Sequence, residues 1–212
     1  MMIQSNKTRS RATWAGIFGG AFLILAFLVK TNAPVISAFD KRIQALLYPI
    51  TNPQMTSFVD KLTFLGGPEM SFIYCLILVV ILALKHSYFN AWWTLATVVI
   101  CNLLNWIIKY IVARPRPADR LVHITGYSFP SGHTFGTALF VFLVLYLLWP
   151  HFKTNITKYL MLFIGGIWII TIALTRIYLH VHYPSDTLAS VLLVATLFNC
   201  SLIIRTHFKN KN

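Results

Sequence analysis

Residues 130–149 read PSGHTFGTALFVFLVLYLLW, a short polar cluster followed by an uncharged apolar run from Thr134 to Trp149. A run of this length lies near the lower limit of the roughly 17–25 residues with which a helix crosses a bilayer. Backbone groups in hydrocarbon must be hydrogen-bonded within the chain, and this run is continuous rather than alternating. It therefore predicts a spanning helix rather than a barrel strand, with the polar cluster at the membrane surface.

Similar apolar runs occupy much of the 212-residue chain, which is 57% hydrophobic and only 11% charged. Soluble domains carry about 25% charged residues, so a soluble core is excluded. We predict an all-α fold with a single domain over residues 1–212, an integral membrane bundle of six transmembrane helices. The expected spans, each extending a few residues into its flanks, are Trp14–Val29, Pro68–Leu84, Ala91–Ile108, Thr134–Trp149, Tyr159–Leu174 and Thr187–Ile204.

A shorter pattern between the first two spans predicts an amphipathic helix on the membrane surface. Pro34 is expected to begin it, and Pro49 and Pro53 to break its continuation. Two interpretations stay open, a connector packed against the bundle and a gate for substrate. The apolar face comprises Ile36, Phe39, Ile43, Leu46 and Leu47, and the polar face comprises Asp40, Lys41, Arg42 and Gln44.

The distribution of the 18 Lys and Arg residues predicts the orientation in the cell membrane. With the N-terminus inside, the inner segments hold nine cations and no acid, and the outer segments hold nine cations and all five acids. Five outer cations lie in or beside polar clusters, and the remaining nine-to-four ratio favours both termini in the cytoplasm and an extracytoplasmic site. The inner cations are Lys7, Arg9, Arg11, Lys85, Lys153, Lys158, Arg205, Lys209 and Lys211.

The net charge of +13 indicates attraction to anionic lipid headgroups, because no basic soluble face for a nucleic acid is visible. Membrane lipids are therefore the expected partners, and nucleic acid is not. Cys75, Cys101 and Cys200 all fall inside predicted spans and show no metal-ligand spacing. Neither a cofactor nor a metal is expected, and the oligomeric state stays open.

The cluster that opens the fourth span has the features of a phosphate cradle. Ser131 is a good helix N-cap, and Gly132 lets the backbone approach a ligand closely. The first N–H groups of a helix lack helical partners and point toward any anion placed there. His133 would lie in this first turn.

Two further clusters are expected at the same outer level. Lys109 ends the third span and precedes Arg116, while Arg176 ends the fifth span. Asp186 follows His182 by four residues at the start of the sixth helix, where it can fix the tautomer of the imidazole and stabilise its cation. Carrying arginine into a membrane is costly, and a phosphate dianion is the partner that three cationic clusters indicate. His180 is expected to have a supporting or a surface role.

In order and spacing, these clusters resemble the three-part signature of the type 2 phosphatidic acid phosphatase family. The matching series is Lys109 with Arg116-Pro117, then Pro130-Ser131-Gly132-His133, then Arg176 with His182 and Asp186. Thr175 departs from the usual serine but keeps a hydroxyl, so a small effect is expected. An Arg114-Pro115 repeat precedes Arg116, and the spacing from Lys109 selects Arg116 as the phosphate contact.

The resemblance implies a metal-independent lipid phosphatase or diphosphatase. His182 would attack phosphorus to form a phosphohistidine, Asp186 would orient it, and His133 would protonate the leaving oxygen. Lys109, Arg116, Ser131, Gly132 and Arg176 would bind the phosphoryl oxygens. Undecaprenyl diphosphate and phosphatidylglycerol phosphate are the favoured substrates, and phosphatidic acid is compatible. The alternative is a non-catalytic membrane protein or transporter that binds lipid phosphate, which would not need the histidine pair with Asp186.

Overall fold

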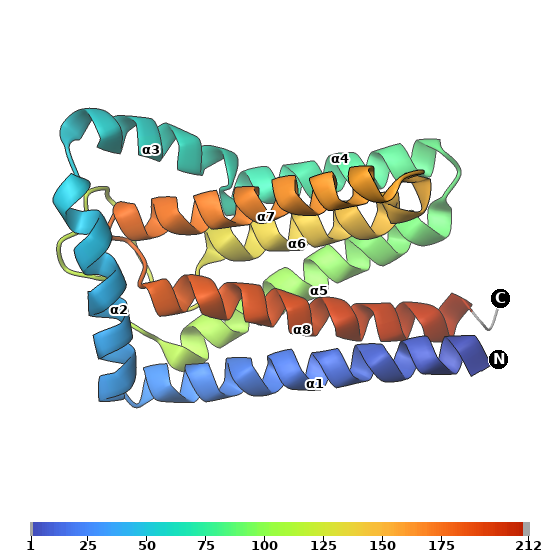
Figure 1. The fold of residues 1–212 in the computed structure, drawn as a ribbon, viewed down its shortest axis with the longest axis horizontal. Helices are drawn as coiled ribbons and strands as arrows, with labels where there is room; N and C mark the ends of the chain where they lie inside the picture. The colour runs from blue at the N-terminus through green and yellow to red at the C-terminus, as the bar shows by residue number, and fades with distance from the viewer. Residues whose placement is uncertain (1, 210–212) are drawn as a thin grey trace.

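The computed structural model describes residues 2–209, and within that range it contains helices and no strand (Figure 1). Six helical segments are long and apolar enough to cross a membrane, which confirms the predicted all-α bundle. Lys211, counted among the inner cations, lies outside the described residues. The helices are α1 (Met2–Lys30), α2 (Pro34–Leu47), α3 (Pro53–Leu65), α4 (Pro68–Leu84), α5 (Tyr88–Val112), α6 (Gly132–Leu148), α7 (Asn155–Tyr178) and α8 (Pro184–Lys209), with short 3-10 turns at Tyr48–Ile50 and Trp149–His151.

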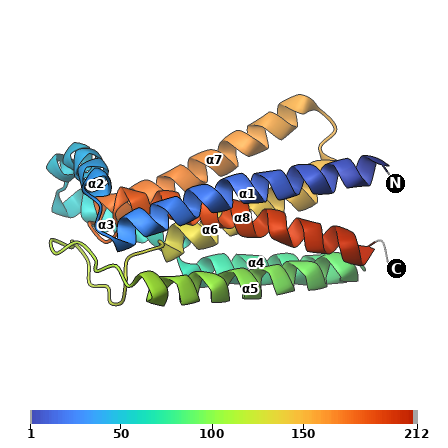
Figure 2. The same cartoon turned by 90° about the horizontal axis from the view of Figure 1, so that it is seen from below.

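The bundle has two chemically different ends. The start of α1 and the end of α8 lie together at one end, which we call the terminal end (Figure 1). The connection from α4 to α5 (residues 85–87) and that from α6 to α7 (residues 149–154) lie there too. Helix α2 crosses the opposite end, which we call the site end, and the long loop 113–131 lies there too (Figures 1 and 2). The five acidic residues lie in α2, α3, the long loop and the first turns of α4 and α8, away from the terminal end: Asp40, Asp60, Asp119, Glu69 and Asp186.

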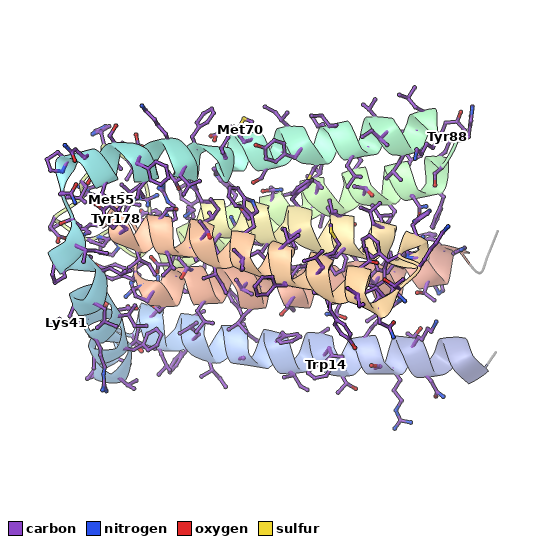
Figure 3. All side chains as sticks on the ribbon, turned by 45° about the horizontal axis from the view of Figure 1, so that its top comes forward. Trp14, Lys41, Met55, Met70, Tyr88 and Tyr178 are labelled. Carbon is purple, nitrogen blue, oxygen red and sulfur yellow. The ribbon has the colours of Figure 1, made fainter. Side chains whose placement is uncertain are left out.

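One helix was missed by the sequence pattern. Pro53 does not end helical structure but begins α3, because proline suits the first turn and the side chain of Asn52 accepts a hydrogen bond from the N–H of Met55. Helix α3 and helix α4 then follow one another through Gly66 and Gly67 as one long apolar segment. At the α2–α3 corner, the hydroxyl of Tyr178, labelled near Met55 in Figure 3, accepts a hydrogen bond from the N–H of Asn52.

Helices α6 and α8 form the centre of the bundle, since nearly half of each spanning window is buried. Helix α1 packs mainly on α8, and α4 packs on α5 and α6. Large apolar side chains cover much of the outer surface, among them Trp14 and Tyr88 (Figure 3). A continuous apolar exterior of this kind is stable only in contact with lipid.

The predicted amphipathic helix forms as α2, but its polar face is only partly solvated. Ile36, Asp40 and Gln44 are buried, while Leu46 of the apolar face is exposed. Helix α2 therefore turns one acidic and one amide side chain toward the bundle. This arrangement is that of a connector packed against the bundle, which was one of the two open interpretations.

Candidate active site

Lys109, near the end of α5, binds the far side of the long loop 113–131. Its ammonium donates to the carbonyl oxygens of Tyr127 at 3.0 Å and Pro130 at 2.7 Å. Ala113 ends α5 in the left-handed conformation, with φ at 52°. Arg114 and Arg116 thus leave the helix and enter the loop that returns to Pro130.

The start of α6 has the expected N-cap. Ser131 is fully buried, and its hydroxyl accepts hydrogen bonds from the N–H and the hydroxyl of Thr134. A Cβ at Gly132 would lie 3.4 Å from the Pro68 ring, so glycine permits close packing of α6 on the start of α4. His133 follows in the first turn, within electrostatic range of Arg176, His182, Arg116 and Lys109. The structure therefore brings the two predicted histidines to the same cluster.

Arg116 faces the imidazole of His182 directly. Its Nη1 lies 3.0 Å from Nε2 of His182 and donates to the carbonyl oxygen of Val181 at 2.9 Å. A guanidinium has no acceptor atom, so Nε2 must be the acceptor and must carry the lone pair. The proton of the neutral ring is then on Nδ1, which faces Oδ2 of Asp186 at 3.4 Å. This is the tautomer that nucleophilic attack by Nε2 requires.

Electrostatics favour the neutral form of His182. Burial lowers its pKa well below 6.5, and the positive charges of Arg116, Arg176 and Lys109 lower it further. Burial also lowers the pKa of Arg116, to about 10. The guanidinium remains charged at neutral pH, so a cation lies beside a nitrogen lone pair.

Asp186 is held by Arg114 rather than by Arg116. Nη1 of Arg114 lies 2.7 Å from Oδ1 of Asp186 and 2.8 Å from the Ser185 hydroxyl. Nη2 lies 2.7 Å from Oδ2 of Asp40 on α2. Burial disfavours the charged form of Arg114, but the two carboxylates outweigh this effect and raise its pKa. The guanidinium, which also packs on the ring of Tyr183, thus joins α2 to the carboxylate beside His182.

Arg176 is positioned by hydroxyl groups. Its Nη1 donates to Oγ1 of Thr63 on α3 at 3.2 Å, and Oγ1 of Thr175 lies 3.0 Å from the same oxygen. The side chain of Arg176 is buried, and its Nε has no hydrogen-bond partner among the described residues. An unpaired N–H in a buried cation is the kind of group that a bound anion satisfies.

His180 is not a surface residue, so that part of the expectation was wrong. Its ring is buried and stacks on Tyr48 with centroids 3.3 Å apart, and Nδ1 lies 2.9 Å from a carboxylate oxygen of Asp119. Burial, together with the negative charge of Asp119, raises the pKa of Tyr48. These contacts tie the loop to the α2–α3 corner, which agrees with a supporting role.

Three residues of this network had no clear signal in the sequence. Asp40 appeared to be part of a solvated face, Arg114 an extra copy of an Arg-Pro pair, and Thr63 belongs to the helix that was missed. Only the tertiary packing of α2 and α3 against α7 and α8 brings them to the site. The buried charge of Asp40 could have been suspected because it falls at the same helical position as Ile36.

A cavity of about 550 Å³ opens at the α2–α3 corner, and no predicted site residue is among the residues that line it. Its lining includes the polar residues Asn52, Thr56 and Asp60 together with Leu121 and Val122 of the loop. Within residues 2–209, no group of three or more His, Cys, Asp or Glu side chains has an arrangement suited to a metal ion. The predicted site residues that the structure brings together are two imidazoles, a carboxylate and three cationic side chains.

Comparison with known proteins gives a consistent picture. The model of the PAP2 superfamily matches residues 90–211. The chain is 32% identical over 182 residues to phosphatidylglycerophosphatase B of Bacillus subtilis (strain 168), covering 84% of this chain and 87% of that protein. Phosphatidylglycerophosphatase B of Escherichia coli (strain K12) is 37% identical over 79 residues, which span 37% of this chain and 27% of that protein.

Two solved structures resemble the fold. The crystal structure of a transmembrane PAP2 type phosphatidylglycerolphosphate phosphatase from Bacillus subtilis superposes with a TM-score of 0.69 at 26% identity, covering 93% of this chain and 96% of that one. That of Aquifex aeolicus LpxE gives a TM-score of 0.57 at 22% identity, covering 76% and 93%. The second likeness concerns the fold alone.

Proposed function

This chain belongs to the PAP2 superfamily and is a lipid phosphatase, and from that premise we propose that it hydrolyses the terminal phosphomonoester of phosphatidylglycerol phosphate without a metal ion. The observation that carries the proposal is the 3.0 Å distance between Nε2 of His182 and Nη1 of Arg116, a guanidinium with no carboxylate within ion-pair distance. The names of the Bacillus subtilis relatives support the substrate.

In the first proposed step, the phosphoryl group binds between Arg116, Lys109 and Arg176, with the Ser131 hydroxyl and the Gly132 N–H on its other oxygens. Nε2 of His182 attacks phosphorus, and a phosphohistidine forms as the phosphorus–oxygen bond to the lipid breaks. His133 gives its proton to the leaving lipid oxygen. Asp186 stabilises the positive charge that develops on the His182 ring, and the cations stabilise the charge on the phosphoryl oxygens.

In the second step, water attacks the phosphohistidine. His133, now neutral, takes a proton from that water, the phosphorus–nitrogen bond breaks, and inorganic phosphate leaves with His182 restored. In this sequence His133 begins and ends protonated, and His182 begins and ends neutral. The site is proposed to open outward, with both termini in the cytoplasm, because the terminal end carries cations and no acid.

Phosphate release by the purified protein in detergent tests the proposal. A panel of phosphatidylglycerol phosphate, phosphatidic acid and undecaprenyl diphosphate is assayed with EDTA present. We expect the highest kcat/KM for phosphatidylglycerol phosphate, and a loss of about 10⁴-fold or more in His182→Ala. His123→Ala, which removes an exposed histidine of the same loop, is the matched control and should retain activity.

Three results would count against parts of this proposal. Inhibition by EDTA contradicts the metal-free mechanism, and a clear preference for undecaprenyl diphosphate contradicts the substrate. Failure to trap an acid-labile phosphoenzyme in a rapid quench contradicts the phosphohistidine. Orientation is tested separately with a membrane-impermeant thiol reagent on intact cells, which should label His123→Cys and not Lys153→Cys.

A further inference from the structure

The terminal end contains a second cavity, at the other end of the bundle from His133 and His182. It has a volume of about 710 Å³ and lies between α1, α6, α7 and α8. Helix α7 diverges from α8 toward this end (Figure 2). The deeper wall is apolar and aromatic, with Phe142, Leu145, Leu162 and Phe198.

The rim of this cavity is strongly cationic. Lys7 and Arg11 come from α1, and Arg205 and Lys209 come from α8. None of the five carboxylate side chains of the protein lines the cavity. Four positive charges around one opening repel one another unless an anion is present.

Arg205 shows how this charge is accommodated without an acid. Its guanidinium donates to the Tyr146 hydroxyl at 3.0 Å and to the side-chain oxygen of Asn90 at 2.6 Å. It also lies over the rings of Phe89, Trp93 and Tyr146, with centroid distances of 5.3–5.4 Å. Every one of these partners is neutral, and Nε of Arg205 is buried without a partner among the described residues.

From this geometry we propose that the cavity binds one anionic phospholipid of the surrounding membrane, with its phosphate at the cationic rim and an acyl chain along the apolar wall. A phosphate diester supplies the negative charge that the neutral partners of Arg205 lack, and an acceptor oxygen for its unpaired Nε. The apolar wall excludes a small soluble anion as the best fit, because such an anion would leave Phe142 and Leu162 uncovered. The bound lipid joins α1, α7 and α8 at the end where α7 diverges. This site is independent of the proposed reaction.

Native mass spectrometry of the full-length protein in detergent tests the site. The protein is titrated with phosphatidylglycerol and with phosphatidylcholine of the same acyl chains. We expect one tightly bound phosphatidylglycerol, and a Kd for it roughly 10-fold or more higher in the double variant Lys7→Gln/Lys209→Gln. Both lysines are exposed, so the variant should fold normally.

The matched control is Arg9→Gln/Lys85→Gln, which removes two charges from the same end but outside the cavity lining. It should bind phosphatidylglycerol as the unmodified protein does. Leu162→Trp fills the apolar wall without changing charge and should also weaken binding. Equal losses in both double variants would reduce the effect to general surface charge and overturn the proposal. Equal affinity for phosphatidylcholine would also overturn the proposal. Loss of the bound lipid in Lys109→Met would overturn it as well, because the lipid would then be bound at the cluster around His182.

Discussion

Arg114 and Arg116 lie two residues apart in one loop, yet their surroundings are opposite. Arg114 contacts two carboxylates, Asp40 and Asp186, and is the centre of an acid-paired region. Arg116 contacts two carbonyl oxygens and the lone pair of His182, and belongs to a cation region with Lys109 and Arg176. The charge of Arg114 is neutralised within the fold, whereas the charge of Arg116 is available to a substrate.

The difference explains how an acid-poor protein can build an anion site. Two of its few carboxylates are paired with one arginine, and one of them, Asp186, lies 3.4 Å from Nδ1 of His182. No carboxylate side chain lies within 4.0 Å of the guanidinium of Arg116, so its charge is not offset by a direct ion pair. Substitution of Arg116 should therefore mainly lower activity, and substitution of Arg114 should mainly lower stability.

The largest expected effect is on catalysis, from Arg116→Ala. Loss of one charged group that stabilises the transferring phosphoryl group costs about 10³–10⁵-fold in rate. The melting temperature in detergent should change little, because no buried carboxylate is left unpaired. Arg116→Lys should restore only part of kcat, since an ammonium lacks the planar fork. A loss of less than about tenfold in kcat/KM would remove Arg116 from the proposed phosphate contacts.

Arg114→Ala should instead act on the fold. Removing one partner of a buried ion pair destabilises a protein by about 3–5 kcal/mol, because the remaining carboxylates stay buried without compensation. Chemical unfolding in detergent measures this. The double variant Asp40→Ala/Arg114→Ala should cost clearly less than the sum of the single variants, because the two residues are in contact. Additive costs would mean that Asp40 and Arg114 do not depend on one another.

The sequence predicted the cation region well and the acid-paired region poorly. The predicted site residues follow a fixed order at the ends of apolar runs, and the structure gathers them at one end of the bundle. They are Lys109, Arg116, His133, Arg176 and His182, together with Asp186, the one member of the acid-paired region that the sequence also indicated. Their assigned roles stay predictions. The ends of spanning helices are fixed by the width of the bilayer, so residues there share a level before any tertiary contact is known.

Asp40 and Thr63 required tertiary information, for a different reason. Helix α2 lies across the bundle end, and although spacing places Asp40 on the same helical row as Ile36, it does not state that this row will meet α8. Helix α3 begins at a proline that also fits the end of a helix. Local patterns in an interfacial segment are weak because water, lipid and protein all border it, so polar and apolar faces do not map simply onto exposed and buried ones.

The acid limb of the pH–rate profile offers a finer test of the cation region. His182 must be neutral to attack, and burial with nearby cations holds its pKa well below 6.5, so the limb of kcat/KM should lie well below pH 6.5. Arg116→Gln removes the first of those charges. The pKa of His182 should therefore rise, and the limb should move to higher pH by the same amount.

The sign of this shift is specific to the arrangement. A cation disfavours protonation of the ring, so its loss must raise the pKa; a fall or no change would mean that Arg116 and His182 are not neighbours in solution. Stability has a related trend. The unfolded chain binds a proton at His182 near pH ~6.5 and the folded chain does not, so stability should fall as the pH drops below that value.

The smallest expected effect concerns Thr175, the departure from the family signature. Its hydroxyl contacts Thr63, the acceptor of Arg176, and serine keeps that hydroxyl while losing one buried methyl group. Thr175→Ser should therefore cost about 1 kcal/mol or less in stability and leave kcat within about twofold. Thr175→Val keeps the shape but removes the hydroxyl, so it should lower kcat by about fivefold through a less well-fixed Arg176. Phosphate release at saturating substrate distinguishes the two variants. Equal activity would show that the position of Arg176 does not depend on this hydroxyl pair.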